Sequence, residues 1–182
     1  MKAIFVRDGD DIHIDRALKI EGWMTQEELL WLAEQAKTHN SIAEIGSYMG
    51  RSTRVLGDNT SGVVYAYDDW YGPREVAIPD SERDLLWQKF CDNLKDLIGK
   101  KVIPCRKNHT EFSAEPLVDM VFIDGDHQYD SVKRDIDFWR NRLANGGLLC
   151  GHDLDQEQVK KAVTDCLGYV TNPAGYIWAV CL

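Results

Sequence analysis

The sequence has 182 residues, of which 44% are hydrophobic, and a formal net charge of −9 at pH 7. This length suits one well-buried domain and is short for two, so we treat residues 1–182 as a single domain. No apolar run of about 18 residues indicates a membrane span. The first residues turn acidic too early for the apolar core of a signal peptide, so we expect a cytoplasmic protein without membrane association.

The charge distribution argues against a nucleic-acid partner, because binding to a phosphate backbone depends on basic patches and the chain has no cluster of Lys or Arg. We expect a small-molecule partner and allow for a homodimer. The five cysteines are widely spaced and contain no C-x-x-C pair, which predicts reduced thiols and neither a disulfide framework nor a structural zinc site.

The first predicted element is a helix at residues 25–37, where Thr25 and Glu28 form a capping box ahead of an apolar stripe. A short apolar strand at 41–46, a helix at 51–59 and a second strand at 62–70 follow. Two prolines and a glycine predict an irregular loop at 71–81. A helical stripe then runs from Leu86 to Leu97 and ends at Gly99.

The second half of the sequence continues the alternation of strands and helices. Strands are expected at 101–105, 118–124 and 148–153, and helices at 131–144 and 159–166. The residues GYV, a turn at NPAG and the final YIWAVCL predict two more strands in a hairpin. The pattern predicts an α/β, Rossmann-like, doubly wound sheet of seven mostly parallel strands, with an antiparallel C-terminal hairpin and helices on both faces.

Polar residues stand where four of the predicted strands end. The sequences are EIGSYMGRST (44–53), YDDW (67–70), DGDH (124–127) and GHD (151–153). In open α/β sheets, ligands bind beyond the carboxyl ends of the strands. We therefore expect these four segments to meet in one cleft.

The segment after the first strand predicts a tight turn that approaches a ligand, because Gly46 and Gly50 tolerate backbone conformations that other residues avoid. Tyr48 and Met49 break the G-x-G-x-x-G pattern of dinucleotide enzymes. Asp68 follows Glu44 by 24 residues (68 − 44 = 24), a fitting distance for strand, helix and strand. Its carboxylate can accept hydrogen bonds from two ribose hydroxyls.

Five motifs in order resemble the class I S-adenosylmethionine-dependent methyltransferases. They are EIGSYMGRST, VYAYDDW, VDMVFIDGDHQYDSVKRDID, LANGGLLCGHDL and VKKAV. The resemblance covers residues 40 to 180 and is closest to the small-molecule O-methyltransferase branch, which includes macrocin O-methyltransferase and the cephalosporin-biosynthesis methyltransferase. It implies an N-terminal helical extension at 1–40 and a catalytic core at 41–182.

The resemblance also implies a set of cofactor-binding residues for S-adenosylmethionine. The segment from Glu44 to Gly50 matches the motif around the methionine portion, and Asp68 matches the acid that holds the ribose. Asn108 and His109 stand where the family contacts adenine, and Asp124 stands near the methionine amine. The full expected set is Glu44, Gly46, Ser47, Tyr48, Gly50, Asp68, Asp69, Trp70, Asn108, His109 and Asp124.

Methyl transfer to a hydroxyl needs a base for the proton or a hard cation that stabilises the alkoxide. Asp126, His127 and His152 are the candidate catalytic residues, since an imidazole can act as a base near neutral pH. Asp124, Asp126 and Asp153 are the candidate ligands of Mg²⁺, which prefers carboxylate oxygens. Purely structural roles for both histidines remain open, and Asp130 is expected to cap a helix.

The expected function is thus methylation of a hydroxyl on a small molecule such as a sugar or secondary metabolite, with Mg²⁺ as an optional second cofactor. The acceptor is expected between the 71–81 loop and the segments after the fourth and fifth strands. Two alternatives stay open. One is a nucleotide-sugar glycosyltransferase with a D-x-D metal site at Asp124 and Asp126. The other is a cofactor-binding module without turnover.

Overall fold

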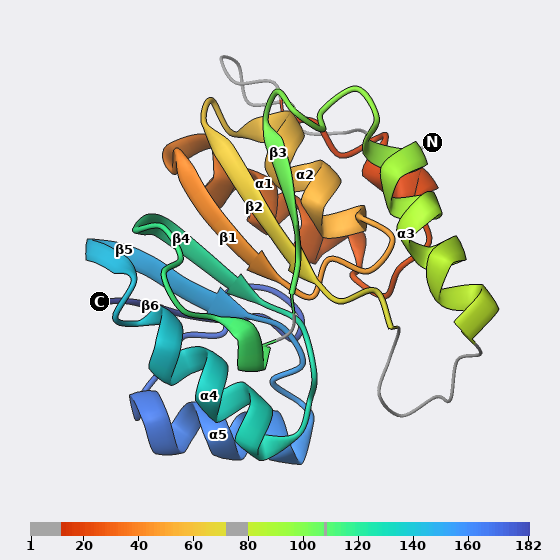
Figure 1. The fold of residues 1–182 in the computed structure, drawn as a ribbon. Coiled ribbons are helices and arrows are strands. Elements are labelled where there is room, and N and C mark those ends of the chain that lie inside the picture. Colours follow the sequence, from red (N-terminus) through yellow and green to blue (C-terminus); the bar gives the residue numbers. More distant parts are fainter. Residues whose placement is uncertain (1–11, 72–79, 108) are drawn as a thin grey trace.

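The computed structural model describes residues 12–71, 80–107 and 109–182, which form a sheet with helices on both faces (Figure 1). Its strands follow the order β3-β2-β1-β4-β5-β6 across the sheet. Their bounds are Ser41–Ile45 for β1, Val63–Asp68 for β2, Val102–Arg106 for β3, Val118–Ile123 for β4, Leu143–Gly151 for β5 and Trp178–Cys181 for β6.

The first five strands pair in parallel, and only β6 runs antiparallel, against β5. Strand order reverses beside β1, which pairs with β2 on one side and β4 on the other. Such a reversal opens a crevice at the carboxyl ends of the strands. The predicted α/β, Rossmann-like fold with an antiparallel C-terminal edge is confirmed.

The expected count of seven strands is wrong for the described residues, which contain six. The segment GYV forms no strand, and pairing there is limited to a bridge between Thr171 and Ala179. Pro173 lacks an amide proton and cannot extend that ladder. The Asn172 side chain instead donates to the carbonyls of Gly175 and Ile177, which closes a loop.

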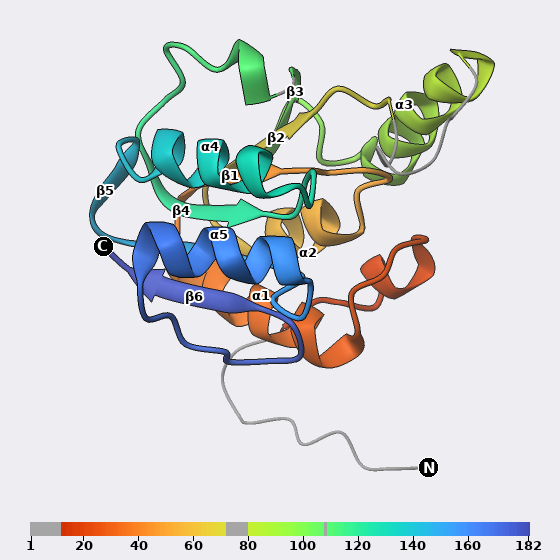
Figure 2. The same cartoon turned by 90° about the horizontal axis from the view of Figure 1, so that it is seen from below.

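Helices cover both faces of the sheet (Figure 2). On one side lie α1 (Gln26–Thr38) and α2 (Arg51–Asn59), beside α3 (Asp80–Leu94), and on the other lie α4 (Tyr129–Trp139) and α5 (Glu157–Leu167). Two short 3-10 helices also occur among the described residues, η1 (Ala17–Lys19) ahead of α1 and η2 (His109–Glu111) between β3 and β4. Each face has its own apolar core, as strands buried on both sides require.

The start of α1 follows local capping chemistry. The Thr25 hydroxyl accepts from the Glu28 amide at 3.3 Å, and Glu28 Oε2 accepts from the Thr25 amide at 2.7 Å, so the predicted capping box is confirmed. The helix expected at 131–144 ends earlier, at Trp139. Leu143 instead begins β5, which is therefore longer than the expected strand at 148–153.

No helix within the described ranges is both long and apolar enough to cross a lipid bilayer. The division into an extension at 1–40 and a core at 41–182 stays a prediction.

Candidate functional site

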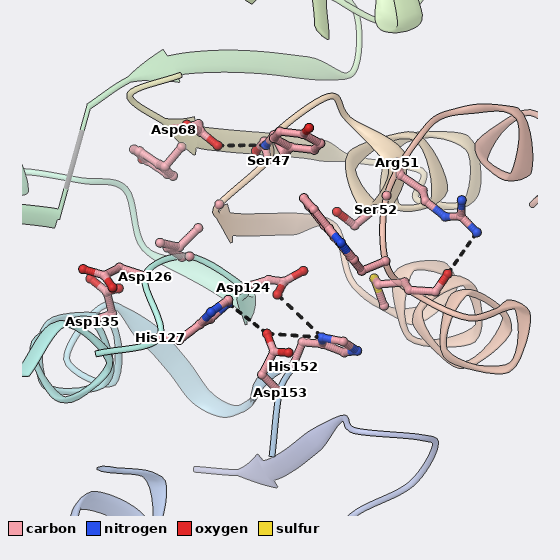
Figure 3. A pocket seen from close by; sticks show the side chains of 18 of the residues that line it. Ser47, Arg51, Ser52, Asp68, Asp124, Asp126, His127, Asp135, His152 and Asp153 are labelled. Atoms are coloured by element: carbon pink, nitrogen blue, oxygen red, sulfur yellow. Dashed lines mark hydrogen bonds and ion pairs between the residues drawn. The ribbon is translucent and has the colours of Figure 1, made fainter. Parts of the chain in front are cut away.

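A cavity of about 420 Å³ opens at the carboxyl ends of β1, β2, β4 and β5 (Figure 3). The four polar segments that were predicted to converge supply much of its wall. Residues 21–24, ahead of α1, supply a further part. The lining comprises Glu21, Gly22, Trp23, Met24, Ile45, Gly46, Ser47, Tyr48, Arg51, Ser52, Tyr67, Asp68, Asp69, Lys107, Phe112, Asp124, Gly125, Asp126, His127, Asp135, His152, Asp153 and Gln156.

The turn after β1 depends on Gly46. Its φ is +91°, and a Cβ at this position would lie 2.0 Å from the carbonyl oxygen of Asp124. Gly50 has a φ of +87° and forms the N-cap of α2, but a Cβ there would meet Leu94 and Phe90 in the core. Gly46 therefore lets the β1 turn lie directly against the β4 loop. Gly50 lets the end of the same turn pack against Leu94 and Phe90 in the core.

Glu44 lies beneath this turn, fully buried. Its Oε2 accepts hydrogen bonds from the hydroxyls of Ser47 at 2.7 Å and Thr53 at 2.5 Å. Its Oε1 has no hydrogen-bond partner among the described residues. Burial raises the pKa of Glu44 to about 7, although the nearby hydroxyls lower it in part. Glu44 thus supports the turn and does not line the cavity itself.

Asp68, the acid at the end of β2, faces the same turn. Its Oδ2 accepts from the Tyr48 amide at 2.8 Å and its Oδ1 from the Trp70 amide at 2.6 Å. Burial raises the pKa of Asp68, and the two amides oppose that shift. Asp69 lines the cavity beside it and accepts from the Tyr71 amide at 2.9 Å.

Trp70 lies outside the lining. Its ring is buried against Trp87 and Phe90, with centroids 4.6 and 4.8 Å away, and its Nε1 donates to the Tyr48 carbonyl. Trp70 therefore braces the β1 turn from the core side. Asn108 lies outside the described residues, and His109 begins η2.

Two carboxylates and an imidazole gather at the ends of β4 and β5. Asp124, His152 and Asp153 each offer a ligand atom, and these atoms lie within 4.8 Å of one another. His152 Nδ1 stands 3.7 Å from Asp124 Oδ1 and 3.4 Å from Asp153 Oδ2. Its other nitrogen, Nε2, lies 3.0 Å from Oε1 of the buried Glu28. The ring is thus held between the cavity and the start of α1.

The charges of this cluster shift each other's pKa values. Burial lowers the pKa of His152, but the hydrogen bond to Asp153 and the charges of Asp124, Asp153 and Glu28 outweigh it and raise the value to about 9. Burial would raise the pKa of Asp153, yet hydrogen bonds from His127 and His152 hold it well below its usual range. Burial raises the pKa of Asp124 to about 7, against the opposing charge of His152.

His127 and Asp126 have different surroundings. His127 Nε2 lies 3.0 Å from Asp153 Oδ2, and its Nδ1 is 3.3 Å from Nε2 of Gln156. Both oxygens of Asp126 are engaged by the start of α4, by the Gln128 amide at 3.1 Å and the Ser131 hydroxyl at 2.8 Å. Asp126 lines the cavity but lies outside the cluster of Asp124, His152 and Asp153. His152 therefore stands in place of Asp126 as the third candidate metal ligand.

The start of α4 corrects another expectation, the cap at Asp130. Gln128 is the N-cap and its side chain makes no capping bond, while Asp130 lies in the first turn. There a carboxylate can interact favourably with the helix dipole.

Among the described residues, three that are not glycine have left-handed backbone conformations, and each follows the end of a strand at this site. They are Tyr48 (φ 45°), Trp70 (φ 55°) and Asp153 (φ 59°). Such conformations cost free energy and persist only where the surrounding structure holds them, which is common at functional sites. Their common location is a structural signal for a working site.

Arg51 and the segment ahead of α1 form a wall that sequence reasoning missed. The Arg51 guanidinium donates to the carbonyls of Ile20 at 3.0 Å and Met24 at 2.9 Å. This fixes Trp23, which is 72% exposed although it lines the cavity, with its ring 5.0 Å from that of Tyr48. No local motif in the sequence indicates this contact.

Two further lining residues, Asp135 and Lys107, were also missed. Asp135 lies on α4 and is only 1% exposed. Burial raises the pKa of Asp135 to about 8, with a smaller lowering by Arg134 and a raising by Asp126. Lys107 Nζ binds Glu115 at 2.7 Å after β3. In the sequence, Asp135 stands three residues after Val132 and four before Trp139, so the helical spacing of the apolar residues could have indicated its burial.

Comparison with known proteins agrees with this geometry. A family described as a methyltransferase domain matches residues 43–154, which include all four polar strand ends. The fold is similar to that of the O-methyltransferase NovP, with a TM-score of 0.63 and 13% identity over 85% of this chain and 79% of that one.

Two further solved structures have the same fold. CalS11, a TDP-rhamnose 3′-O-methyltransferase of calicheamicin biosynthesis, matches with a TM-score of 0.61 and 14% identity, over 84% of this chain and 76% of that one. The N-methyltransferase NodS from Bradyrhizobium japonicum WM9 matches with a TM-score of 0.56 and 17% identity, over 83% of this chain and 90% of that one. The chain therefore belongs to the methyltransferase-domain family and is an S-adenosylmethionine-dependent methyltransferase of the class I fold.

Proposed function

We propose that this methyltransferase acts on a hydroxyl group of a small molecule, with help from a divalent cation. The observation that carries the proposal is the cluster of Asp124, His152 and Asp153, which shares one cavity with the glycine turn after β1. A cation site beside a cofactor turn suits an acceptor that must lose a proton before it attacks.

The cavity fits S-adenosylmethionine at the turn after β1. Only a residue without a Cβ fits at Gly46, because the Asp124 backbone lies against it, and this contact holds the turn beside Asp124. We assign the turn from Gly46 to Tyr48 to the methionine portion and Asp68, with Asp69, to the ribose. Asp124 lies between this turn and His152, so it can serve the methionine amine or a cation.

The donor set also fits a divalent cation. Asp124, Asp153 and His152 supply two carboxylates and an imidazole nitrogen. Carboxylates suit Mg²⁺ and Mn²⁺, whereas an imidazole favours the transition metal. We therefore expect tighter binding of Mn²⁺ than of Mg²⁺. When bound, such a cation supplies positive charge that favours loss of the acceptor's proton.

We assign proton removal to Nδ1 of His127, which would exchange its contact with the Gln156 side chain for the acceptor hydroxyl and take the proton. Asp153 lies 3.0 Å from its Nε2 and can orient the ring, as carboxylates do for catalytic histidines. His152 is a poorer base because its surroundings raise its pKa to about 9, so that it keeps its proton near neutral pH. Asp126 is occupied by the start of α4, so its contribution is to hold the loop that carries His127.

The acceptor side of the cavity is assigned to residues 21–24, where Trp23 and Tyr48 present an aromatic surface. Aromatic faces bind the apolar faces of rings, so a sugar or an aromatic alcohol is the favoured class. Most of the loop expected at 71–81 lies outside the described residues. Tyr129 turns toward α5, where its hydroxyl donates to Asp165 at 2.9 Å.

The two alternatives are less well supported. A glycosyltransferase D-x-D site would need both Asp124 and Asp126 on one cation, yet Asp126 accepts from Gln128 and Ser131. Family membership also favours methyl transfer. A module without turnover would keep the turn and Asp68 but would show no transfer with any acceptor.

The proposal is tested by titration with MnCl₂ and by methyl-transfer assays with S-adenosylmethionine over a panel of sugar and aromatic hydroxyl acceptors. We expect one Mn²⁺ site and turnover that EDTA lowers and added metal restores. Asp153→Asn should weaken Mn²⁺ binding at least tenfold, whereas Asp155→Asn, at an exposed position two residues on, should not. Turnover that is indifferent to EDTA, or transfer confined to nitrogen acceptors, would contradict the proposal.

A further inference from the structure

Glu28 is a buried acid that contacts a candidate metal ligand from behind the cavity wall. It lies in the first turn of α1, is only 1% exposed, and is not among the residues that line the cavity. Its Oε1 lies 3.0 Å from Nε2 of His152, which is 124 residues away in the sequence. Glu28 therefore reaches the cavity through His152.

The capping box of α1 uses only one of the two carboxylate oxygens of Glu28. Oε2 accepts from the Thr25 amide at 2.7 Å and from the Thr25 hydroxyl at 2.9 Å. Oε1 accepts from the Tyr176 amide at 2.8 Å and also meets His152. A Cβ at Gly175 would lie 2.1 Å from this oxygen, so the loop ahead of β6 approaches it this closely only with glycine there. Helix capping explains the contacts of Oε2, and those of Oε1 need another explanation.

The contacts of Oε1 determine which nitrogen of His152 carries a proton. A backbone amide can only donate, so the oxygen that the Tyr176 amide contacts is an acceptor, and Nε2 donates to it. In the neutral ring the other nitrogen, Nδ1, then has a free lone pair. Nδ1 lies 3.7 Å from Asp124 Oδ1 and 3.4 Å from Asp153 Oδ2. The nitrogen that can bind a cation is thus the one that faces the other two candidate ligands.

The rest of His152 is also held in place. Its backbone amide donates to the Ile123 carbonyl at 3.1 Å, and its carbonyl accepts from Trp178 Nε1 at 3.2 Å. The Tyr176 ring lies edge-to-face with the imidazole, with centroids 6.3 Å apart. In Figure 3 the imidazole points its Nδ1 side toward Asp124 and Asp153. The ring therefore cannot turn Nε2 toward the cavity without leaving Glu28.

We propose that Glu28 is a positioning residue for the cation: it accepts a hydrogen bond from Nε2 of His152 and so directs Nδ1 toward a divalent cation. The assignment rests on the cation site proposed above and adds to it a residue that touches neither cation nor substrate. A carboxylate behind a histidine ligand fixes the orientation of the ring and raises the basicity of the nitrogen that binds the metal. Glu28 thereby connects metal affinity to the start of α1 and to the loop ahead of β6.

Calorimetric titration with MnCl₂ tests the role of Glu28. Glu28→Gln keeps the size of the side chain but places an amide donor among groups that themselves donate, so Mn²⁺ should bind about tenfold more weakly than in the wild type. Glu27→Gln, at an exposed position of the same helix, should keep the wild-type affinity. Thr25→Ala removes the hydroxyl of the capping box, so it should lower the unfolding temperature and leave the Mn²⁺ affinity unchanged.

A double-mutant cycle separates positioning from a simple loss of charge or stability. In His152→Asn no imidazole remains to be positioned, so adding Glu28→Gln should change the Mn²⁺ affinity by less than about twofold. A loss of charge alone would weaken binding equally in both backgrounds. That result, or an unchanged affinity in the single variant Glu28→Gln, would overturn the role of Glu28 and leave the cation site in place.

Nuclear magnetic resonance on the wild type tests the tautomer without relying on a variant of Glu28. Zn²⁺ is diamagnetic and suits imidazole, so long-range proton–nitrogen correlations of the ring can be recorded with ZnCl₂ present, and their loss in His152→Asn identifies them. We expect the ring proton of His152 on Nε2 and the cation on Nδ1. A proton on Nδ1 would overturn the assignment, whereas a wild type that binds neither Mn²⁺ nor Zn²⁺ would overturn the cation site itself.

Discussion

The protonation of each charged residue at the ends of β4 and β5 depends on its charged neighbours. His152 Nδ1 lies near both Asp124 and Asp153, and its Nε2 lies near Glu28. Glu28 also accepts from the Tyr176 amide at 2.8 Å, so the first helix and the C-terminal segment both contact this group. A change to one member therefore alters the protonation of the rest.

Manganese binding should become tighter as pH rises from about 7 to 9. A cation that takes His152 as a ligand must displace the proton, and the pKa of His152 is raised to about 9 by its carboxylate neighbours. Calorimetric titration at pH 7.0 and 8.5 should show stronger binding at the higher pH. In His152→Asn that pH dependence should be much weaker, and affinity independent of pH in the wild type would contradict the assignment.

Glu44 should make the unliganded protein less stable as pH rises. Burial raises its pKa from 4.5 to about 7, so the folded state binds this proton more tightly than the unfolded chain does. The stabilisation is complete below pH 4.5 and is lost as pH rises through 7, a change on the order of 3 kcal/mol.

Urea unfolding at pH 5 and pH 8 compares wild type with Glu44→Gln. The variant, relative to wild type, should gain stability at pH 8. An equal difference at the two pH values would show that Glu44 does not titrate in this range.

The β1 turn shows how a single element sets the geometry of the site. Gly46→Ala should destabilise the fold by about 3 kcal/mol or more, because the new Cβ would lie 2.0 Å from the Asp124 carbonyl oxygen and φ is +91°. Gly99→Ala is the matched control, with φ of +77° and no atom within 4 Å. It should cost only about 1 kcal/mol in urea unfolding. Equal costs would mean that contact with the β4 loop is unimportant.

Much of the arrangement of the strands and of their polar ends could be predicted from the sequence. The strands carry continuous apolar runs that end in acids, so the convergence of Asp68, Asp124 and Asp153 follows from parallel topology alone. The seventh strand was overpredicted because a short apolar segment next to Pro173 lacks the length to form a ladder.

What could not be predicted depends on tertiary contacts. Trp23 reaches the cavity only because Arg51 binds the carbonyls on either side of it, a contact across about 30 residues. Trp70, two residues after Asp68, turns into the core against Trp87 and Phe90, and its Nε1 donates to the Tyr48 carbonyl.

At the scale of the whole molecule, the sheet order places four strand ends around one cavity while the two apolar cores hold the strands in register. The central claim is that this cavity binds the methyl donor. Calorimetric titration with S-adenosylhomocysteine tests it most directly, with Asp68→Asn as the site variant and Asp92→Asn, on α3, as the control.

We predict one binding site in the wild type and in Asp92→Asn, and affinity at least tenfold weaker in Asp68→Asn, which loses part of its capacity to accept hydrogen bonds from ribose. No binding by the wild type at millimolar ligand, or undiminished binding by Asp68→Asn, would contradict the account.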